Sequence, residues 1–200
     1  FTAARSRRMR MICGKVLMDR NAPEYLTDTA ESGYFESKEL IERWHGKGRL
    51  SYAVTPRFAP TCSDEQLTKA GQLLREHPDI YLHTHLAENL DEVKWVKELF
   101  PQCSGYLDVY DRFGLLGHHS IFAHCIHLND KEFELLHQTG SGIAFCPTSN
   151  LFLGSGLFNL TQAENKKINV GLGTDTGAGT SFSLLQTINE AYKTQQLRDH

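Results

Sequence analysis

The sequence lacks any apolar run long enough to cross a bilayer, which takes about 20 consecutive apolar residues. It also lacks a clear excess of either charge, because 21 Lys and Arg residues face 24 Asp and Glu residues, for a net charge of -3. A nearly neutral chain gives no reason to expect nucleic acid or a membrane as a partner. The one basic run, Arg5 to Arg10, is short, and we interpret it as a solvated helix end or turn rather than a binding patch.

The cysteines lack the spacing of a structural framework. There are five of them, an odd number, and no two form a Cys-x-x-Cys pair. This pattern argues against a set of disulfides and against a cysteine zinc knuckle, and it predicts a reducing cytoplasm as the location. The sequence shows no signal peptide and starts with Phe rather than Met, so we expect the chain to begin inside a longer protein.

Glycine-rich phosphate loops are missing as well. No G-x-G-x-x-G follows a predicted strand and no G-x-x-x-x-G-K-[ST] occurs, which disfavours the nucleotide-binding open sheets. What the sequence does contain is an alternation of strand and helix patterns, with a long loop over residues 20–35. Strands are predicted over residues 10–18, 50–58, 80–86, 121–126, 142–146 and 169–174, with helices over 37–44, from 63, from 89, over 129–140 and over 181–195. Capping boxes are predicted where three of these helices start, at Ser63 with Gln66, Asn89 with Glu92, and Asn129 with Glu132, and Gly140 should end the fourth helix. The last helix should carry Leu184, Leu185, Ile188 and Ala191 on one face. The alternation predicts a one-domain α/β protein with a parallel sheet, but it does not separate an open sheet from a closed barrel.

Polar residues interrupt the ends of four predicted strands. They are Thr55-Pro-Arg57, His83-Thr-His85 with Glu88, His124, and Gly173-Thr-Asp175. The carboxyl ends of parallel strands meet on one face of a barrel, where such groups converge. His83 and His85 face the same way because side chains alternate along a strand.

The residue types suit a metal site with a proton carrier. Two histidines and an aspartate from separate strands are suitable ligands for Zn²⁺ or Fe²⁺. Glu88 comes three residues after His85, where a carboxylate could reach a water on the metal without being a ligand itself. Taken singly, a strand histidine is more often structural and an aspartate after Gly-Thr often caps a turn. The four strand ends together are what favour a functional site.

Several stretches then resemble the amidohydrolase superfamily, specifically its purine and pyrimidine deaminase branch. The resemblance runs nearly from end to end. It rests on TPRFA (55–59), HTHLAEN (83–89), DVYDRFGLL (108–116), FAHCIHL (122–128), AFCPTSN (144–150), CPTSNLFLGSGLF (146–158) and GLGTDTGAG (171–179). It implies a metal-dependent (β/α)₈ barrel, hydrolysis of guanine to xanthine and ammonia, one Zn²⁺ per subunit with Fe²⁺ as the other option, and a homodimer.

The resemblance also implies roles for individual residues. His85 and Asp175 match metal ligands that also border the substrate, and Glu88 matches a proton-shuttling carboxylate that touches it. His124 matches a catalytic histidine that holds the water or the substrate. Arg57 and Phe58 match residues that contact the purine. His83 receives no role, and we interpret Cys146 and Asn150 as structural: a small buried side chain and a hydrogen-bonded turn.

One feature of the family pattern is not found. The family places its first two ligands in a His-x-His on the first barrel strand. His83-Thr-His85 is not that pair, because too many strands precede it and the x-x-Glu that follows belongs to the fifth strand. We therefore expect residues 1–200 to be a partial barrel domain, roughly strands three to eight, without the first two strands and without the family's small β-domain.

Two other functions stay open. One is a related aminohydrolase that acts on a triazine, a pterin or an adenosine-like ring, against which Arg57 and Phe58 favour guanine. The other is a non-catalytic scaffold, which is disfavoured by the presence of His85, Glu88, His124 and Asp175. The zinc site of cytidine deaminases is excluded, since it needs P-C-x-x-C, and the sequence has none.

Overall fold

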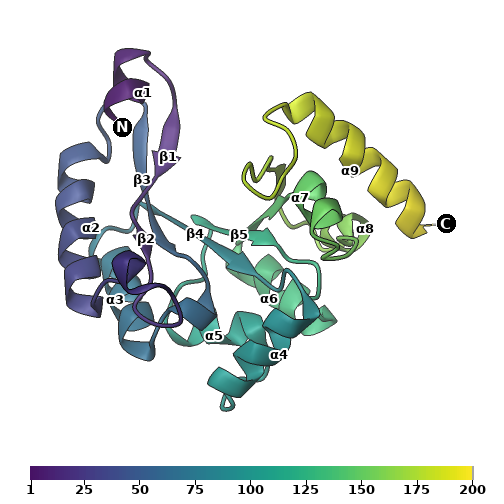
Figure 1. The fold of residues 1–200 in the computed structure, drawn as a ribbon, viewed down its shortest axis with the longest axis horizontal. Helices are drawn as coiled ribbons and strands as arrows, with labels where there is room; N and C mark the ends of the chain where they lie inside the picture. Colours follow the sequence, from purple (N-terminus) through teal and green to yellow (C-terminus); the bar gives the residue numbers. More distant parts are fainter. Residues whose placement is uncertain (200) are drawn as a thin grey trace. The chain divides into compact units, whose positions relative to one another are not determined.

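The computed structural model describes residues 1–199, which fall into two compact units. The first unit comprises residues 1–84 and 110–115, and the second comprises residues 85–109 and the chain from Leu116 onward. Strand β4 (Tyr81–Leu86) and helix α5 (Tyr106–Arg112) each run from one unit into the other. Both units follow the predicted alternation of strand and helix (Figure 1).

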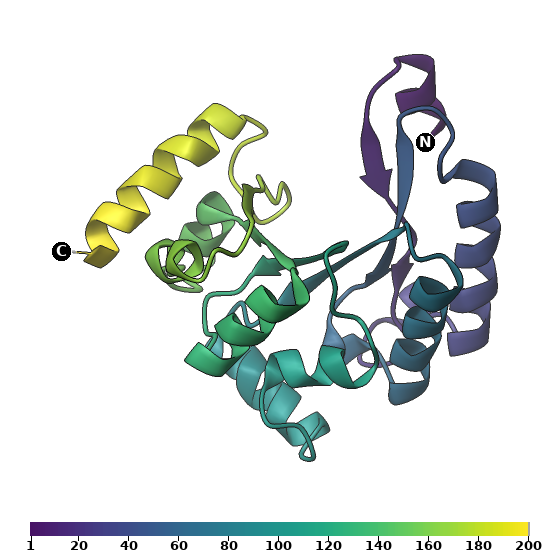
Figure 2. The same cartoon turned by 180° about the vertical axis from the view of Figure 1, so that it is seen from behind.

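The first unit is built around strand β3 (Leu50–Pro56). Strands β1 (Met11–Cys13) and β2 (Val16–Leu17) both pair with it in parallel, and the first residues of β4 pair in parallel with it as well. Helices α2 (Ala30–Trp44) and α3 (Asp64–Glu76) pack against β3 and each other, as Figures 1 and 2 show. The short elements of this unit are α1 (Thr2–Ser6), η1 (Glu24–Leu26) and η2 (Ala59–Thr61).

The predicted strand over residues 10–18 is two strands, separated at Gly14. A Cβ atom at Gly14 would lie 1.8 Å from the carbonyl oxygen of Ala53, so only glycine lets the two backbones approach this closely. The next residue, Lys15, donates its N–H to the Tyr52 hydroxyl at 3.1 Å instead of to a strand. Residues 1–199 therefore hold seven strands rather than the six expected.

Helix α2 starts seven residues earlier than predicted. The Thr29 side chain accepts the Ser32 N–H at 3.0 Å, and the Ser32 hydroxyl accepts the Thr29 N–H at 3.0 Å. This reciprocal cap begins the helix inside the stretch predicted as a loop. The prediction was wrong because serine takes the place of the Glu or Gln that usually marks a capping box.

The cap of α3 is half of the one predicted. Ser63 accepts the N–H of Gln66 at 3.1 Å, as expected. The Gln66 side chain does not return the bond; it is buried, and its amide atoms have no hydrogen-bond partner within the described residues.

The second unit contains the parallel strands β5 (Ser120–His124), β6 (Gly142–Phe145) and β7 (Val170–Leu172). Its aromatic core includes Phe145 and Phe158, whose ring centres are 4.9 Å apart. Burying a side chain of this size contributes roughly 1.5–3 kcal/mol. The helices are α4 (Leu90–Leu99), α6 (Asp130–Thr139), α7 (Pro147–Phe152), α8 (Leu160–Asn165) and α9 (Leu184–Asp199).

Two helix starts in this unit confirm local predictions. Asn89 with Glu92 and Asn129 with Glu132 both form complete capping boxes, at α4 and α6. Gly140 ends α6 in the left-handed conformation, at φ 69°, as its position in the sequence predicts.

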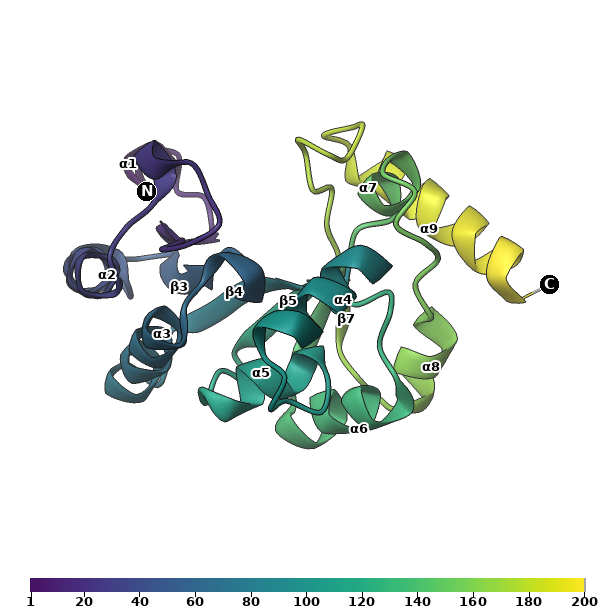
Figure 3. The ribbon, with the colours of Figure 1, turned by 60° about the horizontal axis from the view of Figure 1, so that its bottom comes forward.

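Helix α9 differs from its prediction in where it begins and in which face it buries. It begins at Leu184 rather than Ser181 and packs against α7, beside which it lies in Figure 3. Thr187, Ala191 and Thr194 are buried. Leu185, predicted to lie on the apolar inner face, is 79% exposed. No helix within residues 1–199 has the length and apolar character needed to span a membrane.

Candidate active site

Strained backbone gathers where the strands of the second unit end. Ala87 after β4, His124 and Cys125 at the end of β5, and Asp175 after β7 all have positive φ, between 47° and 71°. A residue other than glycine seldom adopts this conformation, and such residues concentrate at functional sites. The predicted site residues His124 and Asp175 are two of the four.

Strand β4 presents His85 opposite its buried side chains. Thr84 and Leu86 are buried, whereas His83 is exposed and His85 is partly exposed, so the two histidines share a face as predicted. The ring of His85 stacks on that of His124, with the ring centres 5.5 Å apart and the planes at 23°. The structure therefore brings together two of the predicted histidines.

His124 has a different partner on each ring nitrogen. Its side chain is 1% exposed, and its Nε2 atom lies 3.7 Å from the Glu88 carboxylate. Its Nδ1 atom lies 2.9 Å from Oδ1 of Asn150, which comes from α7. An amide oxygen can only accept, so Nδ1 carries the proton and Nε2 faces the carboxylate. This role of Asn150 was not predicted, because nothing in its spacing from His124 reveals it.

Glu88 is held in place by bonds within its own turn and by bonds to two segments further along the chain. Its N–H donates to the Glu92 carboxylate at 2.9 Å, and the Ser155 hydroxyl donates to its Oε1 at 3.4 Å. The carbonyl of Ala87, one residue earlier, accepts the N–H groups of Ile126 and His127, both at 3.1 Å. These bonds attach the turn that carries Glu88 to the segment that follows β5.

The Cys146 thiol lies among these groups. Its burial, together with the negative charges of Asp175 and Glu88, raises its pKa to about 12, while a hydrogen bond with the His124 backbone acts in the opposite direction. The thiol is therefore protonated at neutral pH and serves as a small buried side chain, as predicted. A Cβ atom at Gly173 would lie 3.0 Å from its sulfur, so Cys146 also packs against the turn that leads to Asp175.

The donors in the described residues do not form a complete metal site. His85 and Asp175 have suitable chemistry, but a catalytic zinc takes three protein ligands and an open position. Over residues 1–199, no group of three or more His, Cys, Asp or Glu side chains is placed to hold a metal ion. The residues present thus fit part of a ligand set and not a self-sufficient one.

Arg57 and Phe58 belong to the first unit, at the carboxyl end of β3. The Arg57 guanidinium lies over the Phe58 ring, 5.0 Å from its centre, in a cation–π contact. The backbone around the pair is fixed: Thr84 donates its hydroxyl to the Arg57 carbonyl at 3.2 Å, and the Ala59 N–H donates to the Tyr110 hydroxyl at 3.0 Å. Arg57 is exposed and Phe58 is partly exposed, so solvent reaches both side chains.

The sequence model of the amidohydrolase family matches residues 2–200. The chain belongs to this family. It is 63% identical over 200 residues to the guanine deaminase of Escherichia coli strain K12, an alignment that covers 100% of this chain and 46% of that protein. The solved structure of E. coli guanine deaminase matches with a TM-score of 0.98 over the same shares of the two chains.

Two further structures match over most of the chain. Guanine deaminase from C. acetobutylicum, which was solved with guanine bound in its active site, is 38% identical with a TM-score of 0.89, covering 92% of this chain and 44% of that one. An adenosine deaminase from Xanthomonas campestris with bound zinc is 22% identical, with a TM-score of 0.87, covering 99% and 44%, which shows the fold alone. The expected fold class is confirmed: a parallel α/β fold that forms part of an amidohydrolase barrel. The chain spans less than half the length of these relatives.

Proposed function

We propose that the protein containing this chain is a guanine deaminase, which hydrolyses guanine to xanthine and ammonia. The observation that carries the proposal is the Glu88–His124 pair at the ends of β4 and β5, in a chain 63% identical to the E. coli enzyme over 200 residues. A carboxylate beside an imidazole can take up and return protons in a partly closed site.

The proposed metal is zinc, with iron as the other option. His85 and Asp175 would each supply one ligand, and the remaining ligands would come from residues outside these 200. When bound, the ion would supply a water activated for attack near neutral pH. The ligand types favour zinc or iron over magnesium, which prefers oxygen donors.

The chain's own residues would move the protons. Asp175 accepts a proton from the attacking water, and His124 orients that water through Nε2. That proton passes from Asp175 through Glu88 to N3 of the ring as the oxygen adds to C2 of guanine. Glu88 then takes the second proton of the water from the added hydroxyl group and carries it to the amino group, which leaves as ammonia. One water is consumed and one amino group is released, so atoms and charge balance.

Arg57 and Phe58 would recognise the purine. Arg57 has fixed N–H donors that suit the carbonyl oxygen of guanine. Phe58 has a flat apolar face that suits the ring. We also propose that the protein acts in purine catabolism as a homodimer, as the family resemblance favours. The odd number of cysteines and the absence of a Cys-x-x-Cys pair favour a reducing cytoplasm as its location.

Ammonia release from guanine by the full-length, zinc-supplied protein tests the proposal. Wild type should produce xanthine and ammonia, and Glu88→Gln should lose at least about a hundredfold in kcat while it keeps its metal. The matched control is Glu42→Gln, the same substitution at an exposed position on α2, and it should leave kcat unchanged. Turnover of a triazine, pterin or adenosine-like ring without turnover of guanine would overturn the assignment of guanine as the substrate. No turnover of any of these would favour a scaffold.

A further inference from the structure

A basic cavity lies at the amino end of β3, in the first unit. It has a volume of about 760 Å³, within the range of small-molecule sites. Leu50, the first residue of β3, is buried beneath it. Since β3 has seven residues, at about 3.3 Å per residue the cavity is roughly 20 Å from Arg57 at the strand's other end. It is therefore separate from the residues proposed to recognise the purine.

Cations line this cavity and acids do not. Its lining residues are Arg5, Arg8, Met9, Arg43, Lys47, Gly48, Arg49 and Leu50. Five basic residues thus line one space in a chain whose net charge is -3. Within residues 1–199 none of the five forms an ion pair, although Arg43 lies over the Trp44 ring.

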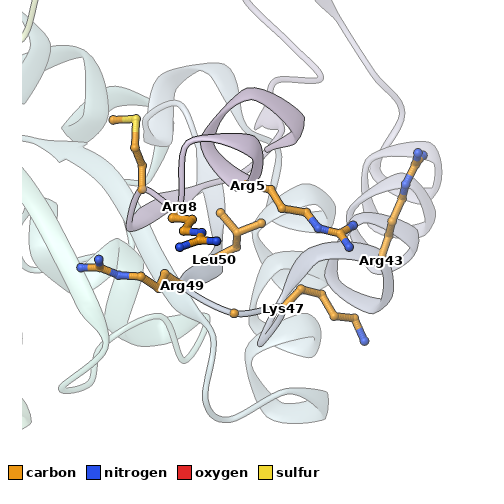
Figure 4. A pocket seen from close by; sticks show the side chains of 8 residues that line it. Arg5, Arg8, Arg43, Lys47, Arg49 and Leu50 are labelled. Atoms are coloured by element: carbon orange, nitrogen blue, oxygen red, sulfur yellow. The ribbon is translucent and has the colours of Figure 1, made fainter.

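The fold assembles the cluster from three segments. Arg5 comes from α1 and Arg8 from the turn after it, while Arg43 lies in the last turn of α2 and Arg49 precedes β3. Figure 4 shows the side chains of Arg5 and Arg8 between that of Arg49 on one side and those of Arg43 and Lys47 on the other. The basic run that we interpreted as a solvated turn therefore divides into two pairs. Arg5 and Arg8 line the cavity, whereas Arg7 and Arg10 do not.

We propose that this cavity binds a compact anion with two or more adjacent phosphate groups. Guanidinium groups match phosphate oxygens in pairs, and several of them around one cavity suit a chain of phosphates better than a single carboxylate. The lining offers no aromatic side chain, so the site has no platform for stacking nucleic-acid bases. The rings of Phe1 and Trp44, which do not line the cavity, stack on each other with centres 5.4 Å apart.

Titration calorimetry of the full-length protein with inorganic tripolyphosphate tests the site. We expect saturable binding that weakens as salt is added, because released counterions and screening both oppose it. The double variant Arg5→Gln/Arg8→Gln should weaken binding about tenfold or more, as expected for the loss of charge-assisted hydrogen bonds. Arg49→Gln should weaken it from the other side of the cavity. Tripolyphosphate can also chelate the bound metal, but the heat of that reaction is the same in every variant and cancels when the variants are compared.

Arg7→Gln/Arg10→Gln is the matched control, since it removes the same charge from the same run outside the cavity. It should change the affinity less than about twofold. Equal weakening by both double variants, no saturable binding, or binding of a single-stranded oligonucleotide without tripolyphosphate would each overturn the proposal. If GTP binds more tightly than tripolyphosphate and guanosine does not bind, the phosphate groups recognised by the site belong to a nucleotide. If GTP and tripolyphosphate bind equally, they belong to an inorganic oligophosphate. Either result supports the site.

Discussion

The Nδ1 atom of His124 lies 2.9 Å from Oδ1 of Asn150, 26 residues further along the chain. The bond fixes which nitrogen of a buried imidazole carries the proton, and so which one faces Glu88. A side chain that sets the tautomer of a catalytic histidine acts through that histidine, and Asn150 is in this sense a positioning residue.

Replacing Asn150 with Leu should lower kcat about 10- to 100-fold, the usual effect of losing a partner that orients a histidine. The KM for guanine should change less, because Asn150 acts on a proton and not on the substrate. Steady-state kinetics with guanine measure both. Asn159→Ala is the control: it removes the side-chain cap of α8, where Asn159 accepts the Gln162 N–H at 3.0 Å. Asn159→Ala should lower the free energy of unfolding by about 1 kcal/mol and leave kcat unchanged. If it lowered kcat as much as Asn150→Leu does, general destabilisation would explain both results.

Metal content should separate ligands from the proton carrier. In the full-length protein, His85→Ala and Asp175→Asn should each lower bound zinc or iron, measured by atomic emission after gel filtration, because each removes a proposed ligand. Glu88→Gln should keep the wild-type metal content while it loses activity. A chelator should abolish ammonia release, and added zinc should restore it. Full metal binding in both ligand variants would contradict the assignment of His85 and Asp175.

The thiols should differ widely in reactivity. Burial raises the pKa of Cys62 to about 12, as it does for Cys146, and raises that of Cys125 well above its ordinary value. Since the thiolate is the nucleophile, a pKa near 12 leaves about one thiol in ten thousand reactive at pH 8. Iodoacetamide on the folded protein should therefore modify Cys103, which is partly exposed, and spare these three. Peptide mass spectrometry checks this, and rapid modification of Cys146 before unfolding would contradict its place in the core.

Glu76 should make stability depend on pH in the acid range. Hydrogen bonds from Tyr34, Gln72 and Lys38 lower its pKa to about 2. A carboxylate whose pKa is lower in the folded state stabilises that state above its unfolded pKa, and the contribution disappears as the pH falls through the folded value. The free energy of unfolding, measured in urea from pH 5 to pH 2, should thus fall less steeply in Glu76→Gln than in wild type. The same slope in both would show that the Tyr34–Glu76 contact carries no linkage in solution.

Local chemistry was sufficient wherever an element depends on residues close to it in the chain. The caps of α4 and α6, the glycine that ends α6 and the alternation along β4 all follow from a few neighbouring residues, and all were predicted. The candidate residues at the strand ends could be named from the sequence for a similar reason, because they stand in short stretches with a family resemblance. The early start of α2 was missed because its serine cap is a weak local signal.

What the sequence determined by itself is the order of the elements, the family and the types of residue available for chemistry. Only the tertiary structure decided that Asn150 meets His124, that Cys146 lies among Asp175, Glu88 and the His124 backbone, and that Arg8 shares a cavity with Arg49. It also decided which face of α9 is buried. The physical reason is that these contacts join residues between about 20 and 60 positions apart, and their formation depends on how whole strands and helices pack rather than on any local preference.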